Sequence, residues 1–138
     1  MKKLISILAV CLILISFSLI TAAERPDPWQ RAKERGVEFR GVGNEPGWHV
    51  EINQDQRINF VNDYGSFELK VPIDDVWVGP EGEDKIYYVE NHLIQFQVII
   101  MKKSYQDTMS GEHLPYQVRV LFPNASYTGG GRLLIDDK

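Results

Sequence analysis

Apolar and polar residues alternate along most of the chain beyond residue 36. Every second position from Tyr116 to Phe122 is apolar, for example, and the polar residues Gln117 and Arg119 stand between them. A period of two predicts a β-strand with one buried face. By this pattern we expect strands at residues 37–42, 47–53, 57–62, 66–71, 85–90, 92–101, 116–122 and 126–135.

The segments between these strands are typical of turns. Residues 62–65 (Asn-Asp-Tyr-Gly) form one, in which Gly65 can adopt a positive φ. Residues 91–92 are expected to form a tight turn, and residues 72–85 a longer polar connection with two prolines and two glycines. A row of about eight short antiparallel strands removes its unpaired edges best by closing on itself. The sequence therefore predicts an all-β fold, a small antiparallel barrel, with a two-sheet sandwich as the alternative.

One short helix is predicted before the first strand, at about residues 28–35. Asp27 suits the N-cap, Pro28 the first helical position, and Gly36 the position just after the helix ends. We expect Trp29 to dock this helix against the β domain.

The N-terminus is typical of an export signal. Lys2 and Lys3 precede an uncharged run over residues 4–23, and the small residues Ala22 and Ala23 offer a cleavage site. Residues 1–23 are therefore expected to be a signal peptide. The run is also long enough for an uncleaved membrane anchor, and lipidation at Cys11 is the least favoured alternative. In each case the folded part is exported, to the periplasm or to the outer face of the cytoplasmic membrane.

The remainder, residues 24–138, has the length of a single domain. Lys2 and Lys3 are the only charged residues before it, so it holds 13 of the 15 basic residues and all 19 acidic ones, a net charge of −6. An acidic domain without a basic patch argues against a nucleic-acid partner. Cys11 is the only cysteine. The exported domain must therefore fold on its core alone, without disulfides.

Several motifs recur in a known order along the chain. Residues 44–48 read Asn-Glu-Pro-Gly-Trp, residues 63–65 read Asp-Tyr-Gly, and residues 107–111 read Asp-Thr-Met-Ser-Gly, with Pro115 following. The last motif comprises Gly129, Gly131, Arg132 and Leu134. In this order and spacing the chain resembles a family of bacterial envelope proteins, labelled predicted membrane proteins or lipoproteins, that carry the Asn-Glu-Pro-Gly-Trp motif. The resemblance implies an envelope location but no defined activity, and members sometimes occur beside small β modules such as lysozyme inhibitors.

The chain departs from that family at two positions. The resemblance implies a cysteine at position 105 and another at position 130, but Tyr105 and Gly130 stand there. We expect the Tyr105 ring to cover Gly130 in place of the disulfide, as an aromatic ring can cover a glycine in a neighbouring strand. The flanking glycines are expected to serve a bulge or a close approach of two backbones.

The Asn-Glu-Pro-Gly-Trp segment supplies the first candidate binding residues, Asn44, Glu45 and Trp48. A structural interpretation is favoured over a binding one. In it, Pro46 and Gly47 shape a turn, Trp48 enters the core, and Glu45 accepts hydrogen bonds from loop amides. We keep all three of the candidates as hypotheses for a binding site.

The second candidate group is Asp107, Ser110, Gly111 and Arg132. Residues 107–113 contain the residue types of a hydrolytic site. However, catalytic triads are assembled from distant segments, and the chain has no Gly-x-Ser-x-Gly motif. An Asp that accepts hydrogen bonds within its own loop, with Gly111 at positive φ, explains the same residues. A rigid Ser-Gly loop also suits recognition of a protein, and it is loosely similar to the Ser-Gly…Tyr loop of C-type lysozyme inhibitors.

No residues are predicted to be catalytic, and no metal or cofactor is expected. His49, His92 and His113 match no metal-ligand spacing, and phosphate-loop, dinucleotide and metalloprotease motifs are absent from the sequence. We therefore expect a non-catalytic binding or accessory module of the envelope, whose partner is an envelope or foreign protein. The alternatives are an inhibitor of a lysozyme-like hydrolase and a carrier of a small apolar ligand.

Overall fold

The structure, a computed structural model, describes residues 25–135. The expected signal peptide or anchor, residues 1–23, lies outside this range. Within it, no helix is both long and apolar enough to cross a membrane.

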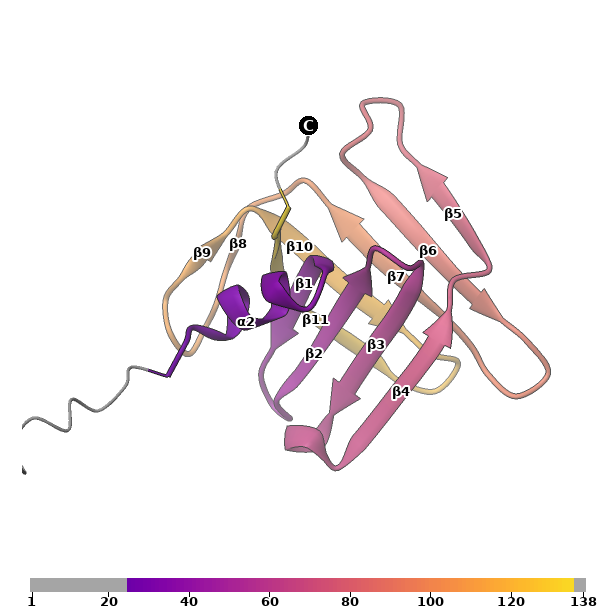
Figure 1. The fold of residues 1–138 in the computed structure, drawn as a ribbon, viewed down its shortest axis with the longest axis horizontal. Coiled ribbons are helices and arrows are strands. Elements are labelled where there is room, and N and C mark those ends of the chain that lie inside the picture. Colours follow the sequence, from indigo (N-terminus) through magenta and orange to yellow (C-terminus); the bar gives the residue numbers. More distant parts are fainter. Residues whose placement is uncertain (1–24, 136–138) are drawn as a thin grey trace, which may run out of the picture.

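Nine strands form one antiparallel sheet that curls into a half-barrel (Figure 1). Their order across the sheet is β4-β3-β2-β1-β11-β10-β7-β6-β5, and β8 pairs with β9 in a separate small sheet. The all-β prediction is confirmed, and the half-barrel is a single sheet rather than the sandwich. The strands are β1 (Val37–Gly43), β2 (Trp48–Asn53), β3 (Arg57–Asn62), β4 (Phe67–Pro72), β5 (Asp75–Val78), β6 (Lys85–Glu90), β7 (Gln95–Met101), β8 (Tyr105–Gln106), β9 (His113–Leu114), β10 (Tyr116–Leu121) and β11 (Ser126–Leu133).

The two outer strands of the sheet, β4 and β5, follow each other in the chain. The two residues between them are bonded to opposite sides of the half-barrel. Ile73 N donates to Gln56 O at 3.0 Å, beside β3, and Asp74 N donates to Tyr88 O of β6 at 2.9 Å. The sheet is therefore bridged at this corner, although β4 and β5 do not pair with each other.

Residues 72–85 are not merely a polar connection, as the sequence predicted. Their central part is β5, which pairs with β6 from Asp75 opposite Tyr88 to Val78 opposite Lys85. All four residues of β5 are exposed. A strand at the edge of a sheet with no buried face shows no alternation, which explains why the pattern missed it. The two-residue strands β8 and β9 were missed as well because they are too short to show a period.

The short helix α2 (Pro28–Glu34) lies on the outside of the half-barrel, against β1 (Figure 1). Pro28 stands at its start and Gly36 follows its end with φ 81°, as predicted. Asp27 occupies the N-cap but its side chain makes no capping hydrogen bond. Ala32 is buried with Val37 and Leu134, and Trp29 packs against this small cluster. Trp29 thus docks the helix, as expected.

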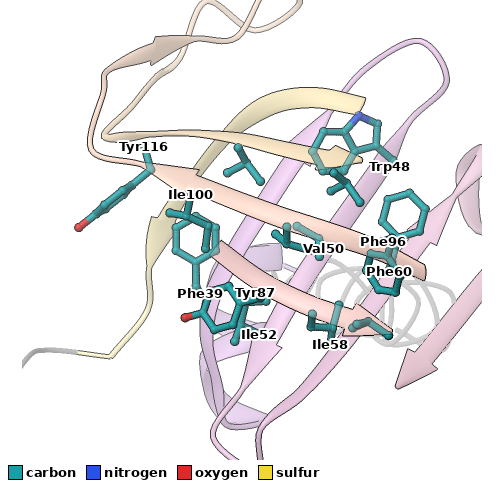
Figure 2. Close-up of a cluster of buried hydrophobic side chains, with 14 residues drawn as sticks. Phe39, Trp48, Val50, Ile52, Ile58, Phe60, Tyr87, Phe96, Ile100 and Tyr116 are labelled. Atoms are coloured by element: carbon teal, nitrogen blue, oxygen red, sulfur yellow. The ribbon is translucent and has the colours of Figure 1, made fainter. Parts of the chain in front are cut away.

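The main core lies on the concave side of the half-barrel (Figure 2). Aromatic rings pack against one another at one end of it. Phe96 and Phe122 stack there with ring centroids 4.8 Å apart, and Phe60 lies 6.2 Å from Trp48. Every side chain of this core and of the cluster under α2 comes from residues 29–134. The described part has a core of its own, and we therefore expect residues 24–138 to fold without the segment that precedes them.

The three glycines of β11 lie where its backbone approaches its neighbours most closely. A Cβ added to Gly129 would lie 2.0 Å from Val42 O, and one added to Gly131 would lie 2.5 Å from the Phe39 ring and 2.6 Å from Arg40 O. Trp48 and Phe39 thus occupy the space that side chains at these two positions would need. The expectation of a close backbone approach is confirmed.

Gly130 faces the other side of the sheet, where the small β8–β9 sheet covers it. A Cβ at Gly130 would lie 2.6 Å from Cδ1 of Tyr105 and 2.7 Å from Cδ1 of Leu114. The Tyr105 ring therefore does cover Gly130, as the sequence predicted.

This contact predicts that Tyr105→Cys combined with Gly130→Cys forms a disulfide under oxidising conditions. Closing the intervening loop should raise stability by about 3 kcal/mol, once the end of the Leu114 side chain has turned aside. The measurement is the melting temperature with and without reductant. Gly130→Cys alone is the control, which should lower the melting temperature because of the clash with Tyr105. A double variant that forms no bond would contradict the placement of these two residues.

Candidate functional site

Three turns that are far apart in the sequence meet at one end of the half-barrel. They are residues 44–47 between β1 and β2, residues 63–65 between β3 and β4, and residues 107–111 between β8 and β9. Asn44 Nδ2 donates to Asp107 Oδ1, which ties the first turn to the third. Tyr64 N donates to Gly47 O at 3.0 Å, which ties the second turn to the first. These three turns carry the Asn-Glu-Pro-Gly, Asp-Tyr-Gly and Asp-Thr-Met-Ser-Gly segments of the sequence.

The turn at residues 107–111 is held in shape by one carboxylate. Asp107 Oδ2 accepts hydrogen bonds from the Ser110 hydroxyl at 2.6 Å and from the Ser110 amide at 2.8 Å. Gly111 N donates to Asp107 O at 2.8 Å, and Gly111 adopts a φ of 73°. The hydrogen bonds from Ser110, and then that from Asn44, hold the pKa of Asp107 below its usual range. The loop interpretation of this motif is confirmed in these contacts.

Three of the four non-glycine residues with positive φ among residues 25–135 lie at this end, the fourth being Gln56 between β2 and β3. Glu45, Asp63 and Tyr64 all have positive φ, of 60°, 49° and 53°. Non-glycine residues rarely adopt this conformation, and when they do they concentrate at functional sites. At Tyr64 the strained backbone presents an aromatic ring that is 82 % exposed. The same ring lies over Gly47, where an added Cβ would be 2.8 Å from Tyr64 Cδ1.

We call residues 44–47, 63–65 and 107–111 the motif-loop surface. Its most prominent side chains are apolar, because Met109 is 72 % exposed and Tyr64 even more so. Hydrogen bonds between the turns hold these two side chains on a fixed frame. The Ser110 hydroxyl is bonded to the Asp107 carboxylate of its own turn and not to a histidine.

The structure places the predicted site residues in different surroundings. Asn44, Asp107, Ser110 and Gly111 come together as described. Arg132 joins them indirectly, because its Nη2 donates to Glu112 Oε1 beside the third turn. Trp48 is buried in the core and is not available to a partner.

Glu45 is exposed, and within residues 25–135 its carboxylate accepts no hydrogen bond. The expectation that Glu45 satisfies loop amides is therefore wrong. The residue is held outward by its turn, and its carboxylate remains open to solvent at the edge of the motif-loop surface.

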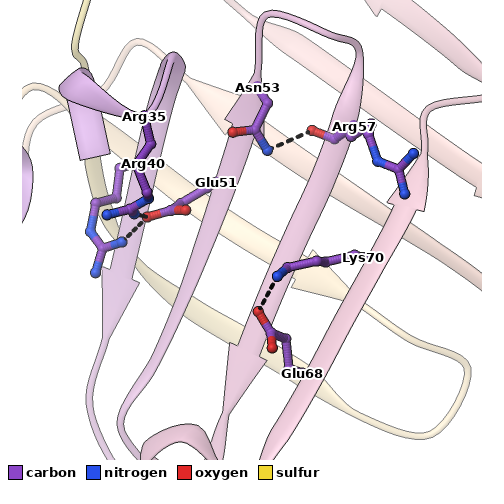
Figure 3. Close-up of polar contacts among 7 residues, drawn as sticks. All are labelled: Arg35, Arg40, Glu51, Asn53, Arg57, Glu68 and Lys70. Atoms are coloured by element: carbon purple, nitrogen blue, oxygen red, sulfur yellow. Dashed lines mark hydrogen bonds and ion pairs between the residues drawn. The ribbon is translucent and has the colours of Figure 1, made fainter. Parts of the chain in front are cut away.

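An ion cluster under the helix was not found from the sequence. Glu51, on the convex face of β2, is only 3 % exposed. Its Oε1 accepts hydrogen bonds from Arg35 Nη2 at 2.7 Å and from Arg40 Nη1 (Figure 3). Trp29 lies above, with Arg132 Cζ 4.5 Å and Arg40 Cζ 6.0 Å from its ring. The cluster joins α2 to the sheet, and through Arg132 and Glu112 it connects to the motif-loop surface.

His49 lies near this cluster, and the charge of Arg40 affects its pKa. Burial is the main cause that lowers the pKa of His49, and the positive charge of Arg40 acts in the same direction. The folded protein therefore disfavours protonated His49. By linkage, the stability that this residue contributes is lost as the pH falls below the ordinary histidine pKa of about 6.5.

No group of three or more His, Cys, Asp or Glu side chains able to hold a metal ion occurs in the part of the chain that the structure describes. The comparisons with known proteins add no further assignment: no family model, no curated protein and no solved structure matches the chain.

Proposed function

We propose that the protein is a non-catalytic binding module of the cell envelope, which recognises another protein through its motif-loop surface. The observation that carries the proposal is the joining of three distant turns by the hydrogen bonds of Asn44 and Gly47, with Tyr64 and Met109 exposed upon them. Export to the periplasm, or to the outer face of the membrane, is the part of this proposal that rests on the N-terminal sequence alone.

The composition of the surface suits a protein partner. Aromatic residues and Met are enriched at protein interfaces, and a few such side chains dominate the binding energy. Residues fixed in their free conformation lose little entropy on binding. The backbone of Tyr64 is held by its hydrogen bond to Gly47, and that of Met109 by the closed turn around Asp107.

A hydrolase that attacks the envelope, such as a lysozyme, is one class of partner for this surface. The turn at residues 107–111 projects Met109 and Ser110 into solvent, as an inhibitor loop must. By contrast, the centre of the half-barrel is filled by its core, which disfavours a carrier with a ligand in the middle of the sheet.

The test is capture of a partner by immobilised residues 24–138, from envelope extract and from a lysozyme panel. We expect Met109→Glu and Tyr64→Asn to weaken binding of the captured protein at least 30-fold, the effect of losing an interface residue worth about 2 kcal/mol. Both changes should leave the melting temperature unaltered because both side chains are exposed. Asparagine is chosen at position 64 because it tolerates a positive φ.

Leu93→Glu is the matched control. Leu93 is 84 % exposed, like Tyr64 and Met109, but it lies in the turn between β6 and β7, outside the motif-loop surface. This variant should bind as the unaltered domain does. Equal loss of binding in the Leu93 and Met109 variants would show general hydrophobic adhesion, and would refute a specific site.

A further inference from the structure

The opposite end of the half-barrel, which we call the tyrosine end, is hollow. A cavity of about 230 Å³ lies there between Phe39, Tyr87, Ile100, Tyr116 and Leu133. A second cavity, of about 280 Å³, lies between the end of β2 and the exposed strand β5. Lys85 and Tyr87 line both cavities. Figure 2 shows the side chains of Tyr87 and Tyr116 at the same end of the core, with their hydroxyl groups pointing away from it.

We propose that the tyrosine end binds a small amphipathic carboxylate, with its apolar chain in the cavity and its charge at Lys85. Five of the nine residues that line the first cavity are aromatic or aliphatic, which suits the chain. Glu83 and Lys102 also line it, and they are paired with each other. The volume limits its length. At roughly 30 Å³ for a group the size of a water molecule or a methylene, the first cavity holds about eight such groups. The cavity is also below the roughly 300 Å³ that larger ligands need.

The two lysines at the tyrosine end, Lys85 and Lys102, differ in whether they have a partner. Lys102 is already paired, since its Nζ lies 3.3 Å from Glu83 Oε1 and from the Tyr116 hydroxyl, and 4.7 Å from the centroid of the Tyr116 ring. Lys85 is partly buried, and no carboxylate oxygen among residues 25–135 lies within 4 Å of its ammonium group. A partly buried cation without a partner is stabilised by an anionic ligand.

Tyr87 offers a hydrogen-bond donor next to this cation. Burial raises the pKa of Tyr87 to about 12, and the negative charge of Glu38 adds to the effect. The phenol therefore keeps its proton at neutral pH and can donate it to a carboxylate oxygen. Within the described residues the Tyr87 hydroxyl has no hydrogen-bond partner of its own.

The experiment is titration of octanoate, followed by chemical-shift changes in ¹⁵N-labelled residues 24–138. We expect saturable shifts for the amides of Lys85, Tyr87 and Leu133. 1-Octanol, which has the same chain without the charge, should bind at least tenfold more weakly. Lack of saturable binding at millimolar octanoate, or equal binding of 1-octanol, would overturn the proposal.

Substitutions of two lysines test whether Lys85 supplies the positive charge that binds the carboxylate. Lys85→Met should weaken octanoate binding at least tenfold, and Lys85→Arg should keep it, because arginine retains the cation. Lys103→Met is the matched control, since Lys103 is exposed and lines neither cavity. Weakening by the Lys103 change to the same degree would exclude Lys85 as the specific contact. This site lies at the other end of the molecule from the motif-loop surface, so either proposal can fail without the other.

Discussion

Gly129→Ala is expected to lower the melting temperature of the domain by at least about 10 °C. The added Cβ would lie 2.0 Å from Val42 O and 2.8 Å from Val42 C. Those atoms belong to the backbone of β1, which pairs with β11 at Val42 opposite Gly130. They can move only if the two central strands separate. Ordinary overpacking lowers stability by about 1–3 kcal/mol, and a clash with paired backbone should exceed this range, with roughly 3–6 °C lost for each kcal/mol.

Thermal denaturation followed by circular dichroism measures the effect. Gly79→Ala is the control, because a Cβ there would meet the Asp84 side chain at 3.2 Å, at a turn outside the centre of the sheet. A few degrees of change at most are expected for this variant. If the Gly129 and Gly79 variants have the same melting temperature, the close approach of β1 and β11 is not what requires glycine at position 129.

Alternation was sufficient to predict the strands that have one buried and one solvated face. In β7 and β10 the residues expected to point inward are the ones that are buried, such as Val98 and Val118. The pattern failed for β5, where no face is buried. It also said nothing of strand order, since the pairing of β1 with β11 joins residues about ninety positions apart.

The candidate site could be predicted only in part, for a related reason. The hydrogen bonds within residues 107–111 are local, and the sequence indicated them through Asp107 and Gly111. The bond from Asn44 to Asp107 spans 63 positions, and a single sequence carries no signal for it. Tyr64 stood in a predicted turn, but its positive φ and its place over Gly47 depend on the fold. The binding hypothesis therefore named several residues of the motif-loop surface, but not its exposed apolar side chains, Tyr64 and Met109.

The alternating pattern was also wrong about the burial of Glu51. It alternates with buried residues of β2, so the pattern placed it in solvent, yet it is buried on the convex face. Its burial results from Arg35, which follows α2, and from Arg40 of β1. A carboxylate can be buried at this position because two guanidinium groups neutralise it and donate to it.

Glu51→Gln is therefore expected to lower the free energy of unfolding by about 3 kcal/mol, or the melting temperature by roughly 10 °C. Burial lowers the pKa of Arg40 and the Glu51 carboxylate opposes this effect, so the carboxylate stabilises the buried charge of Arg40. The neutral amide cannot balance the Arg40 charge, whose side chain is only 12 % exposed. Arg35 is 55 % exposed and can turn to water, which keeps the expected loss at the low end for a broken buried ion pair. Urea denaturation measures the change.

Two further variants separate charge from shape. Glu68→Gln removes the carboxylate of an exposed pair with Lys70 on the same face (Figure 3), and we expect no measurable change. Arg40→Met combined with Glu51→Leu removes both buried charges, and should recover most of the stability that Glu51→Gln loses, because apolar side chains can replace a buried ion pair. If the double variant is as unstable as Glu51→Gln, the loss comes from packing under α2 and not from an unbalanced guanidinium. Recovery would instead show that Glu51 is needed only to neutralise Arg40. Each of the two buried charges would then be stable only because the other is present.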